Sequence, residues 1–551
     1  MRVPKSLRNL SGLGALALIG FGLFSGDEVS DGRWLAILGT AWILLLTGMH
    51  MDMPVNLPTF NRGLIRTSLV IVSVFILISA QLVRIQVVQS DATYNRTSQA
   101  PDGEVISNPR ASNTNLNVSR GRIFDREGVL IADTVGDDGQ FLRTYPDPAT
   151  AYVAGYFSPL LYGSAGLELS WNDELSGRSR QSSIDGWLNG LLGRAQEGLD
   201  LNLTLDAELQ KTGTDLLAGR TGSVVIMDAE TGAILTLVSA PTYDPNQLFT
   251  AQSSDNDNAT DYWEQLVANP DSPLLLRSTM GLYTPGSTFK TITAAAALER
   301  NIADPDSVYE DNGSIVIDGR ELVENNRPDD NKDQWTLEEG VGWSLNVVLA
   351  QVGLQIGADG FWESATFFGI GEDVPFDLQV AQGQIAGDRD FLDSQNALAD
   401  TAFGQGELLV SPIQMVMVAA CFNNGGQMMQ PYLVETVASK DGEVVETTSP
   451  EVWRTPVSES TANDVREMMI FAVEEGSIQR AAGTGYEVGG KTGTAETGDG
   501  GVNSWYIGFI GDGTSRYSVA VVLEDDSSGL GTAVDIGTQM LVETIDNSLN
   551  N

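Results

Sequence analysis

The feature that most constrains the fold of this 551-residue chain is an uncharged, mainly apolar run over residues 67–83. A helix that crosses a membrane needs about 20 mainly apolar residues, and about 17 is near the lower limit. Two further apolar runs, residues 9–25 and 34–49, precede it. We therefore predict three membrane spans within an anchor that covers residues 1–88.

The charges beside these runs indicate how the chain crosses the membrane. Basic residues precede the first and third runs (Arg2, Lys5, Arg8, Arg62 and Arg66), and acidic residues fill the short loop between the first and second. The positive-inside rule places the N-terminus in the cytoplasm and the chain after residue 88, roughly, outside. A competing interpretation makes the first run a signal peptide, but the Ser-Gly-Asp-Glu that follows is a poor cleavage site.

The composition excludes several classes of function. Asp and Glu number 73 against 31 Lys and Arg, so the net charge is −42, whereas nucleic-acid binding needs basic patches. We expect an acidic, solvated surface and no nucleic-acid partner. With one cysteine, Cys421, and one histidine, His50, an internal disulfide is excluded, and neither a metal site nor a cofactor is expected.

Turn signals and local composition divide the rest of the chain. Residues 89–118, rich in Ser, Asn, Asp and Thr, are predicted to be a linker. Residues 119–200 are predicted to form a β-rich pedestal module without catalytic residues, beginning with a hairpin around Asp125–Gly128. Residues 201–551 are predicted to form a C-terminal domain. The fold class is therefore mixed α/β.

Within the C-terminal domain, strand and helix patterns predict an antiparallel sheet covered by helices. Residues 222–239 have a strand–turn–strand pattern, residues 505–523 a hairpin around Asp512-Gly513, and residues 533–549 an amphipathic helix. Residues 301–340 are acidic and are predicted to be loop-like.

A candidate nucleophile lies where Pro285-Gly286 leads into an alanine-rich helix. Ser287 and Lys290, three residues apart, share one helix face. A serine needs an adjacent base, and the only histidine borders an apolar run, so a buried lysine with a lowered pKa is the remaining candidate. The alternative is that Ser287 caps an ordinary helix and Lys290 is solvated. Lysines are scarce, however, and among six only Lys290 follows a serine by three.

Two further motifs invite the same chemistry. In the predicted strand Lys491-Thr-Gly-Thr494, Lys491 and Gly493 share a face, and the glycine lets a ligand backbone approach the strand edge. Ser344 and Asn346 supply a hydroxyl and an amide, suited to proton relay and to binding a peptide bond. Ser-x-Asn occurs five times in the chain. The pattern at Ser344 is therefore informative only because it lies between the Ser-x-x-Lys and Lys-Thr-Gly motifs in the sequence.

Ser-x-x-Lys, Ser-x-Asn and Lys-Thr-Gly in this order resemble the penicillin-recognising serine enzymes. Within that group, residues 119–546 look like a class B penicillin-binding protein of the actinobacterial type. The resemblance includes Arg120–Arg126, Leu203–Asp206, Asp228–Gly232, Ser239–Pro245 and Gly404–Gly406. It implies a membrane-anchored D,D-transpeptidase that cross-links peptidoglycan stem peptides through a serine acyl-enzyme and is inhibited by β-lactams.

The resemblance also implies a role for each motif residue. Ser287 would be acylated with Lys290 as its base, and Ser344 would relay protons. Asn346 would bind the substrate amide, and Lys491 would add positive potential. The N–H groups of Ser287 and Thr494 would form the oxyanion hole, and the segment Thr492, Gly493 and Thr494 would bind the terminal carboxylate of the donor. Because no glycosyltransferase-like domain precedes the pedestal, a membrane glycosyltransferase would be a partner, alongside membrane lipid.

Two departures and three alternatives accompany this interpretation. Three spans replace the single span common in the family, and the segment between Lys491 and Trp505 is short and glycine-rich. A β-lactamase or carboxypeptidase on the same fold is one alternative, although no glutamate is assigned to activate a deacylating water. A β-lactam sensor would need a cytoplasmic output module, for which residues 50–66 are too short. A structural wall-assembly scaffold with an inactive site conflicts with intact Ser287, Lys290 and Lys491.

Overall fold

The computed structural model divides the chain into two compact units, residues 1–115 and 116–551. It describes residues 5–24, 30–50, 58–85, 98–99, 105–106, 118–136, 141–180, 197–249, 256–496, 500–511, 513, 516–526 and 531–550. The predicted linker, residues 89–118, lies almost entirely outside these described residues. The exceptions are Val118 and the paired two-residue strands β1 (Ser98–Gln99) and β2 (Val105–Ile106).

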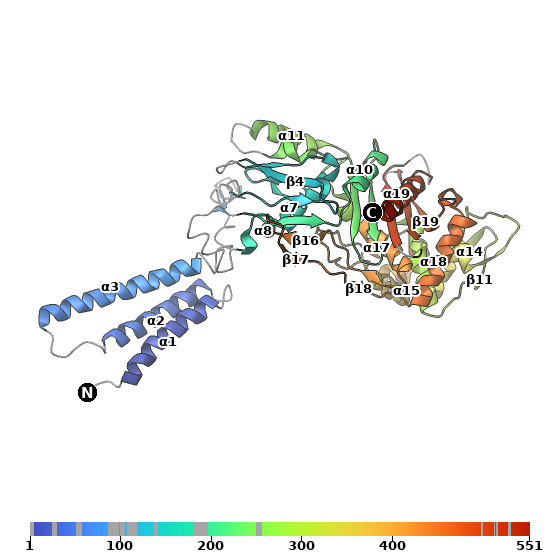
Figure 1. Ribbon diagram of the computed structural model, residues 1–551. Coiled ribbons are helices and arrows are strands. Elements are labelled where there is room, and N and C mark those ends of the chain that lie inside the picture. Colours follow the sequence, from blue (N-terminus) through green and yellow to red (C-terminus); the bar gives the residue numbers. More distant parts are fainter. Residues whose placement is uncertain are drawn as a thin grey trace. The chain divides into compact units, whose positions relative to one another are not determined.

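The described residues of the first unit form three helices, α1 (Lys5–Phe24), α2 (Asp31–His50) and α3 (Thr59–Val83). They correspond to the three predicted apolar runs (Figure 1). Among the described helices, only α3 holds an apolar stretch long enough to cross a membrane, at Gly63–Val83. The three-span topology therefore stays a prediction.

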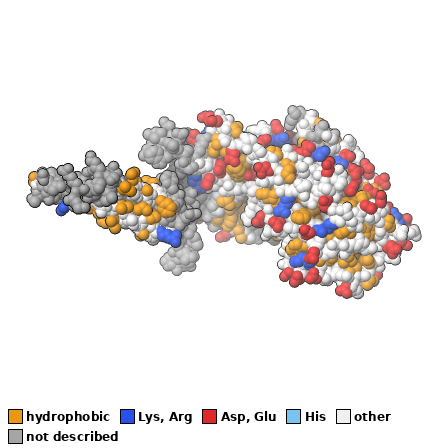
Figure 2. Space-filling model, turned by 90° about the horizontal axis from the view of Figure 1, so that it is seen from below, with side chains coloured by type: hydrophobic (Ala, Val, Ile, Leu, Met, Phe, Trp, Pro, Cys, Tyr) orange, Lys and Arg blue, Asp and Glu red, His pale blue; other side chains and the backbone are white. Residues whose placement is uncertain are grey.

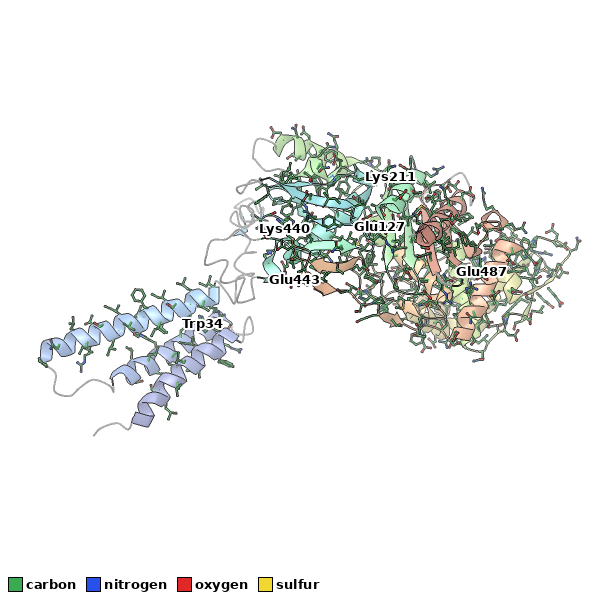
Figure 3. The ribbon with its side chains drawn as sticks, viewed as in Figure 1. Trp34, Glu127, Lys211, Lys440, Glu443 and Glu487 are labelled. Carbon is green, nitrogen blue, oxygen red and sulfur yellow. The ribbon has the colours of Figure 1, made fainter. Side chains whose placement is uncertain are left out.

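Buried polar contacts join α2 to α3. The indole of Trp34, labelled in Figure 3, donates to Gln81 Oε1 at 2.6 Å. About two turns further along α2, the indole of Trp42 donates to Ser73 Oγ at 2.9 Å. Such hydrogen bonds between apolar helices stabilise helix association where water is excluded.

The second unit begins with a six-stranded sheet in the order β17-β16-β8-β3-β4-β5. Its strands are β3 (Ile123–Phe124), β4 (Leu130–Val135), β5 (Leu142–Thr144), β8 (Asp200–Leu203), β16 (Val434–Ala438) and β17 (Val444–Thr447). The antiparallel pairing of β3 with β4 confirms the hairpin predicted around Asp125–Gly128. The sheet also recruits β16 and β17 from within the predicted C-terminal domain, so the division of residues 119–551 into two domains stays a prediction.

Short elements lie between β5 and β8 in the sequence, and a buried ionic cluster connects one of them, α7, to Arg143 on β5. They are η3 (Pro148–Thr150), α6 (Ala151–Ala154), β6 (Phe157–Ser158), β7 (Gly163–Ser164), α7 (Leu167–Ser170), α8 (Asn172–Leu175) and η4 (Arg178–Arg180). Glu168 on α7 accepts from Arg120 Nε at 2.9 Å and from Arg143 Nε at 2.5 Å. All three side chains are buried, and the two guanidinium groups lower the pKa of Glu168 against the opposing effect of its burial.

The second sheet is antiparallel throughout, with five strands in the order β10-β9-β21-β20-β19. Its strands are β9 (Gly222–Asp228), β10 (Ile234–Ala240), β19 (Glu487–Glu496), β20 (Val502–Gly511) and β21 (Arg516–Leu523). On β9, Val224 and Ile226 pack in a core with α19 (Gly531–Asn550) and α10 (Ala207–Leu216). Val225 and Met227 point into the opposite core. This alternation puts helices on both faces and confirms the predicted helix-covered sheet.

The remaining elements lie mainly between β10 and β19 in the sequence. The helices are η5 (Pro245–Leu248), α11 (Asn256–Ala268), α12 (Arg277–Met280), η7 (Gly286–Phe289), α13 (Lys290–Glu299), α14 (Leu337–Gly342), α15 (Asn346–Phe367), η8 (Arg389–Asp393), α16 (Gln395–Ala402), α17 (Pro412–Asn423), α18 (Glu459–Glu474) and η9 (Gln479–Ala481). Two short strands, β15 (Met428–Met429) and β18 (Val452–Arg454), pair with each other.

The prediction that residues 301–340 are loop-like is wrong, because this segment contains two pairs of strands. It carries the strand pairs β11 (Val308–Glu310) with β14 (Gln334–Thr336) and β12 (Ser314–Ile317) with β13 (Arg320–Val323). A capping box of Thr336 and Glu339 then starts α14. Each of these strands has only three or four residues, too few to display the apolar alternation by which strands are predicted.

The charge distribution on the surface agrees with the composition. Figure 2 shows Asp and Glu side chains over the visible face of the larger unit, with Lys and Arg among them. The acidic excess is therefore spread along this face and does not form a single patch there.

Candidate active site

Ser287 lies in the 3-10 turn η7, which runs directly into α13 at Lys290. Neither helix is capped by Ser287, because Pro285 and Phe289 occupy the two N-cap positions without a side-chain cap bond. The interpretation of Ser287 as an ordinary capping residue is therefore wrong. Its side chain is half-buried, and within the described part of the chain its hydroxyl makes no hydrogen bond.

Close backbone contact places this turn against the edge strand β19. Gly286 has a left-handed φ of 55°, and its N–H donates to Gly404 O at 2.9 Å. A Cβ atom on Gly286 would lie 2.4 Å from the carbonyl oxygen of Thr494, and one on Gly493 would lie 2.5 Å from Pro285 O. Glycine is required at both positions because any side chain would push η7 away from β19.

Lys290 is fully buried, so the alternative of a solvated lysine is also wrong. Its Nζ donates to Ser344 O at 2.5 Å, to Asn346 Oδ1 at 2.8 Å and to Ser344 Oγ at 3.3 Å. Burial lowers the pKa of Lys290 to about 7, and the charge of Glu324 acts in the opposite direction. At neutral pH a substantial fraction of this amine is therefore unprotonated and able to accept a proton.

Lys491 on β19 reaches the same hydroxyl from the other side. Its Nζ donates to Ser344 Oγ at 2.8 Å and to Thr492 O at 3.1 Å. The side chain is fully buried. Burial, and then the neighbouring Lys290, lower the pKa of Lys491 well below its ordinary value. Ser344 Oγ is thus hydrogen-bonded to two buried amines, an arrangement that can pass a proton between them.

Ser344 lies in an uncommon backbone conformation between α14 and α15. Its φ is 63°, in the left-handed region that few non-glycine residues adopt. Its carbonyl oxygen accepts from Lys290 and from Asn326 Nδ2 at 2.8 Å. Asn346, which is half-buried, is the first residue of α15.

The Thr-Gly-Thr segment of β19 borders the same place. Thr494 is exposed, whereas Thr492 is buried. Gln405 Nε2 donates to Thr494 O at 3.2 Å, and the indole of Trp505, paired with Gly493, donates to Thr284 O at 3.1 Å. Direct hydrogen bonds thus unite Lys290, Ser344, Asn346 and Lys491, while the contact of η7 with β19 brings Ser287 beside Thr494.

Two residues near Lys290 were not predicted from the sequence. Glu324 and Asn326 follow β13, in the segment that the sequence predicts to be an acidic loop. Acidic residues are so frequent there that nothing local distinguishes Glu324. Among the residues that the structure describes, no group of three or more His, Cys, Asp or Glu could hold a metal ion.

Two family models and several known proteins match this chain. Residues 222–541 match the family described as penicillin binding protein transpeptidase domain. Residues 120–201 match the penicillin binding protein A dimerisation domain. The peptidoglycan D,D-transpeptidase PbpA of Mycolicibacterium smegmatis is 34% identical over 418 residues, which are 73% of this chain and 83% of that protein.

Solved structures agree with these matches. A penicillin G acyl-enzyme complex of penicillin-binding protein A from M. tuberculosis has a TM-score of 0.70 and 32% identity, and covers 78% of this chain and 99% of that one. The D,D-transpeptidase domain of a peptidoglycan glycosyltransferase from Eggerthella lenta has a TM-score of 0.68 and 33% identity, with coverage of 78% and 99%.

Proposed function

The chain belongs to the class B penicillin-binding proteins, and from this premise we propose that Ser287 is the residue acylated by stem peptides and by β-lactams. As a member, it is a serine-type peptidoglycan D,D-transpeptidase and a target of β-lactams. One observation supports the assignment above all others: two buried lysines share the hydroxyl of Ser344 beside the turn that carries Ser287.

Acylation begins with a proton transfer. The neutral amine of Lys290 takes the proton of the Ser287 hydroxyl, whose oxygen attacks the carbonyl carbon of the last peptide bond of a donor stem. The N–H groups of Ser287 and Thr494 stabilise the resulting oxyanion. When the C–N bond breaks, Ser344 passes a proton from the lysines to the leaving amine. The terminal D-amino acid departs and an ester on Ser287 remains.

Transfer reverses these proton movements. The amine of an acceptor stem attacks the ester carbonyl, Lys290 and Ser344 take up its proton, and Ser287 regains its own as the ester bond breaks. A β-lactam acylates Ser287 in the same way, but its amide lies in a ring, so the leaving amine stays attached to the adduct. Asn346 binds the substrate amide in both cases.

Binding of the donor carboxylate involves Lys491 with Thr492, Gly493 and Thr494. In the free protein the lowered pKa of Lys491 disfavours the ammonium form. An anion beside Nζ favours that form, so the positive potential of Lys491 arises together with substrate binding. The exposed hydroxyl of Thr494 supplies a donor to the same carboxylate.

The N-terminal helices anchor the enzyme in the membrane. The helices α1, α2 and α3 span the membrane, with the N-terminus in the cytoplasm and the catalytic unit outside. Outward apolar side chains on α3, such as Phe75 at 66% exposure and Ile71 at 52%, support contact with lipid. Strand polymerisation falls to a separate membrane glycosyltransferase.

The test of the acylation site is peptide mapping after treatment with a labelled penicillin. The wild-type adduct is expected on Ser287, and Ser287→Ala is expected to remain unlabelled with an unchanged melting temperature, since Ser287 caps no helix. Ser278→Ala, which alters a buried serine on the neighbouring helix α12, is the control and keeps its label. An adduct on any other residue, or a labelled Ser287→Ala, refutes the assignment.

A further inference from the structure

Glu324 lies where β13 ends and is almost completely buried, with 7% of its surface exposed. Its Oε2 accepts from the N–H of Val347 at 2.9 Å. Its Oε1 accepts from the N–H groups of Asn325 and Asn326, both at 3.0 Å. Val347 is the second residue of α15. The carboxylate therefore satisfies an otherwise unpaired N–H of that helix and lies at its positive end.

The backbone segment that Glu324 organises contacts the candidate active site at two points. Asn326, whose N–H binds Glu324, donates through Nδ2 to Ser344 O at 2.8 Å. Asn346, which directly precedes Val347, accepts from Lys290 at 2.8 Å. Two of the groups that hold Lys290, the carbonyl of Ser344 and the amide of Asn346, are therefore attached to structure that Glu324 orders.

The conformation of Ser344 needs such support. A serine with φ near 63° is strained by roughly 1–3 kcal/mol, and the surrounding contacts must maintain it. The hydrogen bonds from Asn326 and Lys290 to its carbonyl oxygen are among those contacts, and the N–H of Ser344 also donates to Val341 O at 3.1 Å. Loss of the bond from Asn326 removes one support of this strained conformation, which sets the position of the Ser344 hydroxyl between the two amines.

The charge of Glu324 matters separately from its hydrogen bonds. The charged groups that act on the Lys290–Lys491 pair in the described structure are these two amines and Glu324. An isolated ammonium is costly to bury, and a nearby carboxylate offsets part of that cost. Glu324 thus favours the protonated form of Lys290, and its removal would shift the equilibrium toward the neutral amine.

We propose that Glu324 is a positioning residue for acylation, which holds Ser344 and Lys290 in their reactive arrangement through Asn326 and the first turn of α15. This inference rests on the proposed function, in which Lys290 is the base for Ser287. It predicts two separable effects of substitution: loss of geometry lowers the maximal acylation rate, and loss of charge moves the pH at which that rate declines.

The experiment measures the second-order rate of acylation by penicillin between pH 5 and 9, roughly, a range centred on the pKa of a perturbed lysine base. Glu324→Gln removes the charge and turns one of the two carboxylate oxygens into an NH2 group. Either Val347 N–H or the N–H groups of Asn325 and Asn326 then lose their acceptor. We expect a maximal rate about tenfold lower and an acid limb displaced by about half a unit to one unit toward lower pH. The direction follows because a neutral Lys290 then exists at a lower pH.

Two further variants separate the effects. Asn326→Ala keeps the charge of Glu324 but removes the hydrogen bond to Ser344, so we expect a lower maximal rate with the acid limb unmoved. Glu299→Gln is the matched control: Glu299 ends α13, the helix that Lys290 begins, and accepts from Ser458 N and Thr461 Oγ1 at the start of α18. About 13 Å of helix separates it from Lys290, and both measured quantities should equal those of the wild type.

Either of two results overturns the inference. One is an acid limb of Glu324→Gln that coincides with those of the wild type and Glu299→Gln. The other is a wild-type maximal rate for Asn326→Ala, which remains informative even if Glu324→Gln does not fold. Failure of the proposed function is distinct, because it would appear as a wild-type adduct on a residue other than Ser287.

Discussion

Lys290 and Lys491 share one hydroxyl group: their Nζ atoms lie 3.3 Å and 2.8 Å from Ser344 Oγ. Both side chains are fully buried. Two ammonium ions in that position would repel each other in a medium of low dielectric constant, so the arrangement favours at least one neutral amine. A neutral amine beside a serine is what an enzyme without a usable histidine requires.

Substitution of the two lysines should give different defects. Lys290→Ala removes the proton acceptor, and we expect acylation by penicillin to fall by at least about 10²-fold. Lys491→Ala should slow acylation while the adduct remains on Ser287, since its role is electrostatic positioning. Stopped-flow acylation with peptide mapping measures both. Equal rates for Lys290→Ala and the wild type would contradict the role of Lys290 as base.

The pH dependence of acylation should follow Lys290. Because burial lowers its pKa to about 7, the rate should fall as pH drops below that value, by about tenfold per unit when the protonated form dominates. The measurement is the acylation rate of wild-type protein over a pH series at constant ionic strength. If the acylation rate is instead constant from pH 5 to 8, a range that extends roughly two units below the pKa of Lys290, another group takes the proton.

The chain supplies a matched control for Ser344. Ser394 begins the same Ser-x-Asn pattern, but its hydroxyl accepts from Ala397 N as the N-cap of α16. We expect Ser344→Ala to slow acylation by about 10²-fold because the relay between the lysines is lost. Ser394→Ala should instead cost about 1 kcal/mol of stability and leave the acylation rate unchanged. Denaturant unfolding and acylation assays on both variants distinguish relay from cap.

The buried ionic cluster of the pedestal should be a point of high sensitivity. Glu168→Gln leaves Arg120 and Arg143 without their shared carboxylate. Breaking a buried pair in this way costs about 3–5 kcal/mol. Chemical denaturation of the second unit measures the loss, with Glu127→Gln, an exposed residue, as the control. A loss below about 1 kcal/mol, typical of a surface pair, would contradict this account.

The proposed topology predicts which engineered cysteines react from outside the cell. Residues 30 and 58 are both exposed positions next to apolar helices, and the native Cys421 is buried. With a thiol reagent that does not cross membranes, Ser30→Cys should be labelled in intact cells and Pro58→Cys only after lysis. The reverse pattern would invert the orientation proposed for the anchor.

Local features of the sequence predicted much of this protein. Pro285-Gly286 followed by alanines indicated a helix that carries Ser287 and Lys290, and the turn residues at Asp125–Gly128 and Glu230–Gly232 indicated hairpins that the structure contains. Such signals are readable because a turn or a helix start depends on residues within a few positions of each other. Each of the three motifs is equally local, and their order along the chain indicated the family.

Only the tertiary structure decided which distant residues meet. Ser344 lies 54 residues from Lys290 and 147 from Lys491, yet all three share a hydrogen-bond network. The strands β16 and β17 complete a sheet that begins at residue 123. Glu324 is one acid among 73 acidic residues until folding buries it beside the start of α15. Burial and long-range pairing arise from the packing of the whole unit, so they cannot be predicted from the helix and strand propensities of neighbouring residues.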